Sequence, residues 1–426
     1  MQQCWRWFGP RDSVPLAHAR QAGATGIVTA LHHLPNGVAW SVDEIDRRKA
    51  EIQAAGMEWS VVESIPVTED IKTRTGEWKR HIAAYQMTLR NLAQRQIKTV
   101  CYNFSPVLDW TRTDLRYQLP DGGLALRFDA TALAIFDLCI LARKEAFDEW
   151  APFRVDLART KFVSMSESER ARLIRTIIAG LPGAEESYSL DRFRIACCRY
   201  KEIGGDDVRS NLVAFLDDII PVAAENGVRL AIHPDDPPRP MLGLPRILVT
   251  AADVRWLLSH VDHSANGLTL CAGTFGVRSD NDVIAIAREF AGRIHFVHLR
   301  NVRREEDSES FYESYHLDGE VDMVTLIQEL TQEERRRRVV ERDDNCIPMR
   351  ADHGHQILDD ITKTVNPGYS AIGRLKGLAE LRGVMRTVES FMYGTSTRDV
   401  GAPRPSADWR EARRSSGSIR DKLWLH

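Results

Sequence analysis

The chain has 426 residues, of which 43% are apolar and 27% are charged, the composition of an ordinary soluble globular protein. Its formal net charge of −3 gives no reason to expect a nucleic-acid or membrane partner, and no stretch reaches the ~18 apolar residues of a membrane span. The 7 cysteines are scattered and odd in number, which argues against a disulfide framework and predicts a reducing, cytoplasmic compartment.

The first hundred residues alternate short apolar runs with amphipathic segments of helix length. The predicted strands cover residues 4–8, 26–31, 59–62 and 98–104, and the predicted helices cover residues 14–23, 42–55 and 78–96. Strands that alternate with crossovers of this length are typical of a parallel sheet.

Residues 105–206 interrupt this alternation. They are polar, rich in arginine and acidic residues, and only partly periodic, with helices predicted over 134–146 and 167–178. We interpret this stretch as a partly helical insertion after the fourth strand. Insertions of this size usually lie on the loop face of a scaffold and often cover its active site.

The alternation then resumes with a helix over 208–225, which Pro221 is predicted to interrupt. The remaining predicted strands cover residues 228–232, 267–270, 294–297 and 346–349, and the remaining predicted helices cover residues 251–261, 282–290, 323–332 and 370–391. Eight such units favour a closed (β/α)8 TIM barrel over an open doubly wound α/β sheet. No glycine-rich phosphate fingerprint follows any strand, which weakens the dinucleotide-binding alternative.

The catalytic barrel is expected to span residues 1–393. Beyond it, residues 394–426 are rich in Gly, Ser, Pro and Arg, a composition typical of a disordered tail, with a short helix expected at 409–413. The charged run at 333–338 is interpreted as the solvated end of a helix rather than as a binding patch.

Four residues of the types that bind metals close the last four predicted strands: His233, Cys271, His298 and Asp352. Singly, each has a structural explanation, and Cys271 could be a small buried hydrophobe. In a barrel the carboxyl ends of all strands open onto one face, so the four side chains are expected to meet there. Two imidazoles, a thiolate and a carboxylate suit a first-row transition metal, without deciding between iron(II), manganese(II) and zinc.

Two further residues at the same mouth could move protons. His353 directly follows Asp352, and Tyr369 follows an Asn-Pro-Gly turn. We expect His353 to act as the base and Tyr369 as the acid, although the reverse assignment is open. The polar residues expected to contact a substrate are His32, Asn103, Arg239, Arg300, His316 and Arg350. The three arginines among them could grip a carboxylate in a bidentate manner.

Several motifs together resemble those of the D-mannonate dehydratase family over roughly residues 1–393. They are Val28-Thr29-Ala30-Leu31-His32-His33, His233-Pro-Asp-Asp-Pro-Pro-Arg-Pro, Asp352-His353-Gly354 and Pro367-Gly368-Tyr369. The resemblance implies a xylose-isomerase-like barrel that binds Mn²⁺ or Fe²⁺ through the four proposed ligands. It also implies dehydration of D-mannonate to 2-dehydro-3-deoxy-D-gluconate in hexuronate (glucuronate) catabolism, with proton transfer by His353 and Tyr369. Residues 143–163 and the tail match nothing in this pattern.

Two other functions compete with this interpretation. A metal-dependent sugar isomerase on the same barrel needs two strand-end carboxylates and usually a lysine, whereas Glu63 and Asp352 are the only clear strand-end acids and no lysine closes a strand. A non-catalytic sugar-acid binding protein should have lost a ligand or the pair of His353 and Tyr369, and none is lost. The expected partner is a small sugar acid, with room for assembly as a homo-oligomer.

Overall fold

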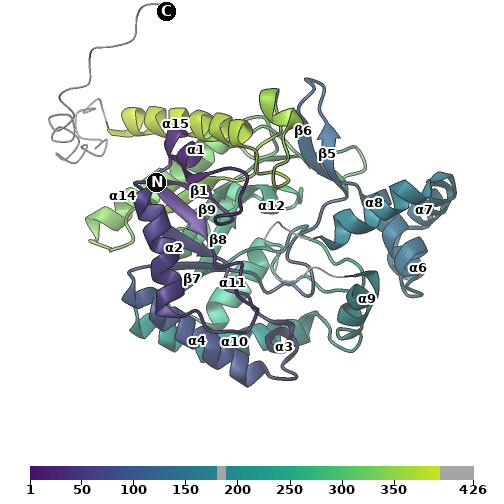
Figure 1. Ribbon diagram of the computed structural model, residues 1–426, viewed down its shortest axis with the longest axis horizontal. Coiled ribbons are helices and arrows are strands. Elements are labelled where there is room, and N and C mark those ends of the chain that lie inside the picture. The colour runs from purple at the N-terminus through teal and green to yellow at the C-terminus, as the bar shows by residue number, and fades with distance from the viewer. Residues whose placement is uncertain (180–188, 394–426) are drawn as a thin grey trace, which may run out of the picture.

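The computed structural model describes residues 1–179 and 189–393. Its centre is a closed barrel of parallel strands in the order β1-β12-β9-β8-β7-β4-β3-β2 (Figure 1). The barrel strands are β1 (Gln2–Arg6), β2 (Gly26–Thr29), β3 (Glu58–Glu63), β4 (Thr99–Tyr102), β7 (Arg229–Ile232), β8 (Asn266–Cys271), β9 (Ile294–Leu299) and β12 (Pro348–Ala351). This architecture confirms the predicted (β/α)8 barrel. The eighth strand begins two residues later than predicted, and Cys346 is exposed.

The barrel interior is filled by a layer of apolar side chains. This layer consists of Cys4, Val28, Val61, Cys101, Ala231 and Phe296. Side chains alternate across a strand, so the residue two positions further along each strand points into the same interior, nearer the mouth. Glu63, His233 and His298 occupy such positions, and the ring of Phe296 meets that of His298 edge-on at 4.7 Å. The apolar layer therefore forms a floor under the polar residues.

Helices surround the barrel, and several begin where the sequence offers a cap. They are α1 (Leu16–Gln21), α2 (Val42–Ala54), α3 (Glu69–Thr73), α4 (Trp78–Gln94), α10 (Gly205–Glu225), α11 (Ala251–His260), α13 (Val283–Glu289), α14 (Met323–Val339) and α15 (Ala371–Tyr393). The side chain of Ser41 accepts a hydrogen bond from the Glu44 N–H and so caps α2, while Thr250 and Asp253 form a capping box on α11. Among the described residues, no helix is both long and apolar enough to cross a membrane.

One expectation about these helices is wrong, and another is confirmed only in part. Helix α10 runs without interruption through Pro221, whose missing N–H lies on the exposed outer face, where the unpaired carbonyl of the preceding turn can bind water. The charged run does form the end of helix α14, and Arg335, Arg336 and Arg338 are exposed as expected. Glu334 and Arg337, however, are buried rather than solvated. Arg337 donates hydrogen bonds to the carbonyls of Ala291 and Ile294 and thereby joins the end of α14 to the start of β9.

The insertion after β4 contains more than the expected helices. Its elements are β5 (Asp114–Gln118), β6 (Leu124–Phe128), α5 (Ala130–Ile135), a π-helix (Phe136–Leu141), α6 (Ala146–Glu149), α7 (Pro152–Ser164), α8 (Glu167–Ile178) and α9 (Leu190–Cys198). The predicted helix at 167–178 is confirmed. The one predicted at 134–146 instead begins at Ala130, after the capping residue Asp129, and ends before Ala142, which adopts a left-handed backbone.

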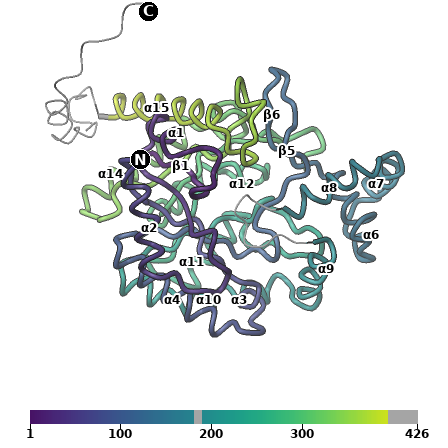
Figure 2. Tube along the Cα trace, viewed as in Figure 1, coloured from purple at the N-terminus to yellow at the C-terminus, as the bar shows by residue number. Residues whose placement is uncertain are grey.

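A second sheet joins this insertion to a loop that follows the barrel strand β9. Its strand order is β10-β11-β6-β5, where β10 is Val302–Arg304 and β11 is Phe311–Glu313. Phe311 pairs with Phe128 across the two segments, and their rings stack at 5.4 Å. Figures 1 and 2 show α6 and α7 standing away from the barrel, while β5 and β6 rise beside it. The predicted tail, with its short helix at 409–413, lies outside the described residues.

Candidate metal centre and active site

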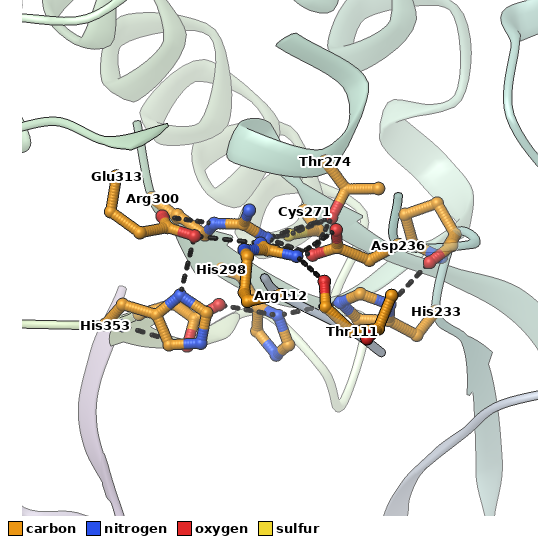
Figure 3. A network of polar contacts seen from close by, with 12 residues as sticks. Thr111, Arg112, His233, Asp236, Cys271, Thr274, His298, Arg300, Glu313 and His353 are labelled. Carbon is orange, nitrogen blue, oxygen red and sulfur yellow. Dashed lines mark hydrogen bonds and ion pairs between the residues drawn. The ribbon is translucent and has the colours of Figure 1, made fainter. Parts of the chain in front are cut away.

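Three of the predicted ligands meet at the mouth of the barrel. His233 follows β7, Cys271 ends β8 and His298 lies one residue before the end of β9, and one donor atom from each lies within 4.8 Å of the other two. Cys271 and His298 are directly opposite each other in the register of β8 and β9. The Nε2 atom of His233 lies 3.2 Å from the Nδ1 atom of His298 (Figure 3). Neighbouring strand ends thus bring two imidazoles and a thiol to one point.

The state of these side chains fits a transition metal. The Nδ1 atom of His233 lies 2.6 Å from the carbonyl of Pro234, a contact that fixes the ring and leaves Nε2 facing the cluster. Burial lowers the pKa of His298 well below its ordinary value, so this imidazole is neutral, the form that binds metals. Burial opposes protonation of His233 too, but the neighbouring Cys271 thiolate outweighs it and raises the pKa of His233 to about 9. A protonated imidazole cannot hold a metal, so metal binding at His233 would release this proton.

The thiol of Cys271 has polar neighbours of its own. The hydroxyl of Thr274 donates a hydrogen bond to its sulfur at 3.1 Å, and Nη1 of Arg300 lies 3.8 Å away. Both groups are hydrogen-bond donors that face the sulfur, so the side chain lies in a polar environment. Cys271 is therefore more than a small hydrophobe at a strand end.

Asp352, the fourth predicted ligand, lies beside this group. Its Oδ2 atom is 3.6 Å from Nδ1 of His298, while its Oδ1 atom accepts a hydrogen bond from Arg350. Burial opposes ionisation, but Arg350 outweighs it and lowers the pKa of Asp352 well below its ordinary value, so the group is a carboxylate. Its place in the ligand set stays a prediction.

A buried network of four charges closes one side of the mouth. Arg112 donates to both oxygens of Asp236, at 2.9 and 3.1 Å, and to Glu313 at 2.8 Å. Arg300 donates to the same two carboxylates, at 2.6 Å to Asp236 and 2.7 Å to Glu313 (Figure 3). Two cations balance two anions, which is the condition for burying them at all.

His353 and Tyr369 lie next to each other, as predicted for a pair that shares proton transfers. Their ring centroids are 5.4 Å apart with the rings nearly perpendicular, and both residues are buried. The Nδ1 atom of His353 lies 3.2 Å from Oε1 of Glu313, and its Nε2 atom lies 3.8 Å from Oδ1 of Asp352. Burial raises the pKa of Tyr369 above that of a free phenol, so its hydroxyl keeps its proton at neutral pH.

Comparison with known proteins agrees with this geometry. The sequence model of the D-mannonate dehydratase family matches residues 1–394. The chain is 56% identical to the mannonate dehydratase of Chromohalobacter salexigens over 392 residues, which are 92% of this chain and all of that protein. The mannonate dehydratase of Marinomonas sp. is 52% identical over 395 residues, again 92% of this chain and all of that protein. The chain belongs to the D-mannonate dehydratase family.

A solved structure supports the same assignment at the level of the fold. The mannonate dehydratase of Streptococcus suis serotype 2 superimposes with a TM-score of 0.72 at 31% sequence identity, over 92% of this chain and 96% of that one. The resemblance predicted from the His-Pro-Asp-Asp-Pro-Pro and Asp-His-Gly motifs is thereby confirmed.

The residues predicted to contact the substrate differ in their surroundings, and two of them are already paired with carboxylates. Arg350 is shared between Glu63 and Asp352, and Arg300 is shared between Asp236 and Glu313, so a substrate carboxylate would compete with these partners. Both arginines are buried, and these contacts hold the site together.

The other four predicted contacts have different surroundings. His32 lines a pocket of about 270 Å³ and faces Phe8, whose ring in turn meets that of Tyr369. Asn103 follows β4 and is half-buried. His316 is buried, burial lowers its pKa to about 4, and it borders a cavity of about 10 Å³ beside His353, roughly the space of one water. Arg239 pairs with Glu309 at 2.8 Å and lines a separate cleft of about 1070 Å³.

Sequence reasoning missed Arg112, Asp236 and Glu313 as members of the site. Asp236 lies inside the His-Pro-Asp-Asp motif, which was a usable signal. Arg112 and Glu313 lie in the insertion and in the loop after β9, where no local pattern distinguishes them from surface charges.

Proposed function

We propose that this protein dehydrates D-mannonate to 2-dehydro-3-deoxy-D-gluconate, a step of hexuronate breakdown, with Mn²⁺ or Fe²⁺ as its cofactor. His233, Cys271, His298 and Asp352 would hold the cation. When bound there, a divalent cation supplies Lewis-acid stabilisation of the negative charge that develops on the substrate as C2 loses its proton. Free thiols throughout the described chain fit a reducing cytoplasm.

The chain's own residues supply the proton transfers. The C2 proton of a sugar acid is weakly acidic because the adjacent carboxylate already carries charge, so a positioned base is needed. The Nε2 atom of His353 faces the ligand cluster and is suited to take this proton. The protonated hydroxyl of Tyr369 is suited to donate a proton to the C3 hydroxyl as it leaves as water. The burial of both residues keeps bulk water from the reacting carbons.

One observation carries the proposal. The cluster of His233, Cys271 and His298, the ligand atoms of which lie within 4.8 Å, occurs beside His353 and Tyr369 in a chain of the D-mannonate dehydratase family. A sugar isomerase on the same barrel would usually also need a lysine at a strand end, and none of the eight barrel strands of this chain ends in a lysine.

The test is turnover. The protein is stripped of metal, reconstituted with Mn²⁺ or Fe²⁺, and incubated with D-mannonate, D-altronate, D-gluconate and a panel of aldoses, with an assay for 2-keto-3-deoxy acid. We expect product from D-mannonate in the reconstituted protein and none in the stripped protein. Ketose formation from an aldose without any keto-deoxy acid would favour the isomerase instead.

A further inference from the structure

Glu313 lies between the charge network and His353. It ends β11, is 2% exposed, and its two carboxylate oxygens are held by different arginines. Oε2 accepts a hydrogen bond from Arg300 at 2.7 Å, and Oε1 accepts one from Arg112 at 2.8 Å. The same Oε1 atom faces Nδ1 of His353 at 3.2 Å (Figure 3). The carboxylate is thus fixed on one side and presents an oxygen to the imidazole on the other.

The imidazole of His353 is oriented by its surroundings. Its two nitrogens face opposite ways, Nδ1 toward Glu313 and Nε2 toward Asp352 on the side of the ligand cluster. The rings of Trp110 and Tyr369 meet it edge-on, with centroids 6.0 and 5.4 Å away. These rings limit how far the imidazole can tilt, but they do not determine which nitrogen faces the cluster. The carboxylate oxygen 3.2 Å from Nδ1 makes an ion-pair contact rather than a directed hydrogen bond, and because an ionised carboxylate can only accept, it favours the imidazole with its proton on Nδ1.

We propose that Glu313 is a positioning residue for His353, and that the insertion takes part in catalysis by supplying the arginine that holds Glu313. The inference rests on the proposed role of His353 in proton transfer. With its proton on Nδ1 facing Glu313, the imidazole offers the lone pair of Nε2 to the substrate. Nε2 then accepts the C2 proton, while Glu313 stays ionised and faces the resulting positive charge.

The segment that carries Arg112 forms part of the wall of the site. Trp110, Thr111 and Arg112 are all buried, and Trp110 forms a bridge with Asp236 in the loop after β7. The guanidinium of Arg112 lies over the ring of Trp110 at 4.7 Å, which orients its fork toward Glu313. Without this segment, Oε1 of Glu313 would lose its only arginine partner among the described residues and could turn away from His353.

The experiment compares two substitutions that each remove one negative charge from the same network. Full-length, Mn²⁺-loaded Glu313→Gln is compared with Asp236→Asn, which also frees both arginines from one carboxylate but does not face His353. We measure kcat, KM for D-mannonate, bound Mn²⁺ and the rate of C2 proton exchange of D-mannonate in D₂O. For Glu313→Gln we expect kcat and C2 exchange to fall together by about 10–100-fold, the effect typical of residues that orient a functional imidazole. KM and bound Mn²⁺ should change by less than about 3-fold.

For Asp236→Asn we expect a similar fall in melting temperature but a smaller fall in C2 exchange at saturating Mn²⁺. Arg112→Lys keeps the positive charge but loses the branched guanidinium that binds Asp236 and Glu313 together. It tests the support of Glu313 in a variant that should fold more readily. We expect kcat and C2 exchange to fall less than in Glu313→Gln. Wild-type exchange in Glu313→Gln, or an equal loss in Asp236→Asn, would overturn the inference. Failure of the proposed function looks different, because the unmodified protein would then form no keto-deoxy acid.

Discussion

Replacement of Cys271 by alanine tests the metal centre with little disturbance of the fold. Structural zinc sites with four donors are worth about 10–16 kcal/mol in small peptides, so one donor in four contributes about 3 kcal/mol. On that scale the variant should bind its cation roughly 100-fold more weakly. The side chain is fully buried, and the loss of one sulfur atom from such a position should lower the free energy of unfolding by about 1 kcal/mol.

The chain offers a matched control in Cys101. Its thiol is also buried inside the barrel and also accepts a hydrogen bond from a threonine, Thr269 at 3.2 Å, as Cys271 does from Thr274 at 3.1 Å. Cys101→Ala should therefore cost the same stability and lose no metal. The assay is elemental analysis after dialysis against limiting Mn²⁺, with melting curves of both variants. Full occupancy in Cys271→Ala would remove this thiolate from the ligand set.

His353→Asn and Tyr369→Phe should each lower turnover by ~10²–10⁴-fold, about 3–5 kcal/mol of barrier, while Mn²⁺ and D-mannonate still bind. In D₂O, C2 exchange should vanish in His353→Asn and persist in Tyr369→Phe; the opposite pattern would reverse the two roles, and near-normal turnover in both would refute the mechanism. Deletion of residues 394–426 should leave turnover and melting temperature nearly unchanged, because the family match ends at residue 394. A fall of many degrees in the truncated protein would show that the tail contributes to the folded body.

The barrel could be predicted because its signals are local. Each strand is a short apolar run, and the polar residue that closes it points into the mouth by simple alternation. That reasoning alone brought His233, Cys271 and His298 together. The helix at Glu167–Ile178 was also placed correctly, and in the structure Ser166 and Glu169 form a capping box at its start.

The parts that were missed depend on contacts between distant segments. The hairpin of β5 and β6 did have a local signal, the turn Pro-Asp-Gly-Gly at 120–123, which the interpretation of residues 105–206 as a partly helical insertion left unused. Nothing local indicates that Arg337 is buried, because its partners are the carbonyls of residues near 291–294. Arg300 was singled out, but as a grip for substrate, whereas its contacts are with Asp236 and Glu313.

The ion pair between Arg112 and Glu313 spans 201 positions of the chain. On a ribosome that adds about 5–20 residues per second, Glu313 is made roughly 10–40 s after Arg112. Throughout that interval strand β6 cannot pair with β11, which has not yet been synthesised. Arg112, which is fully buried in the folded protein, must remain in water or pair with another group. The strands of the first half of the chain can begin to associate as they emerge. The mouth of the barrel, however, cannot form until the second half of the chain has been synthesised. A nascent chain stalled before residue 313 should therefore expose this segment to proteases and chaperones, even where its early strands are already paired.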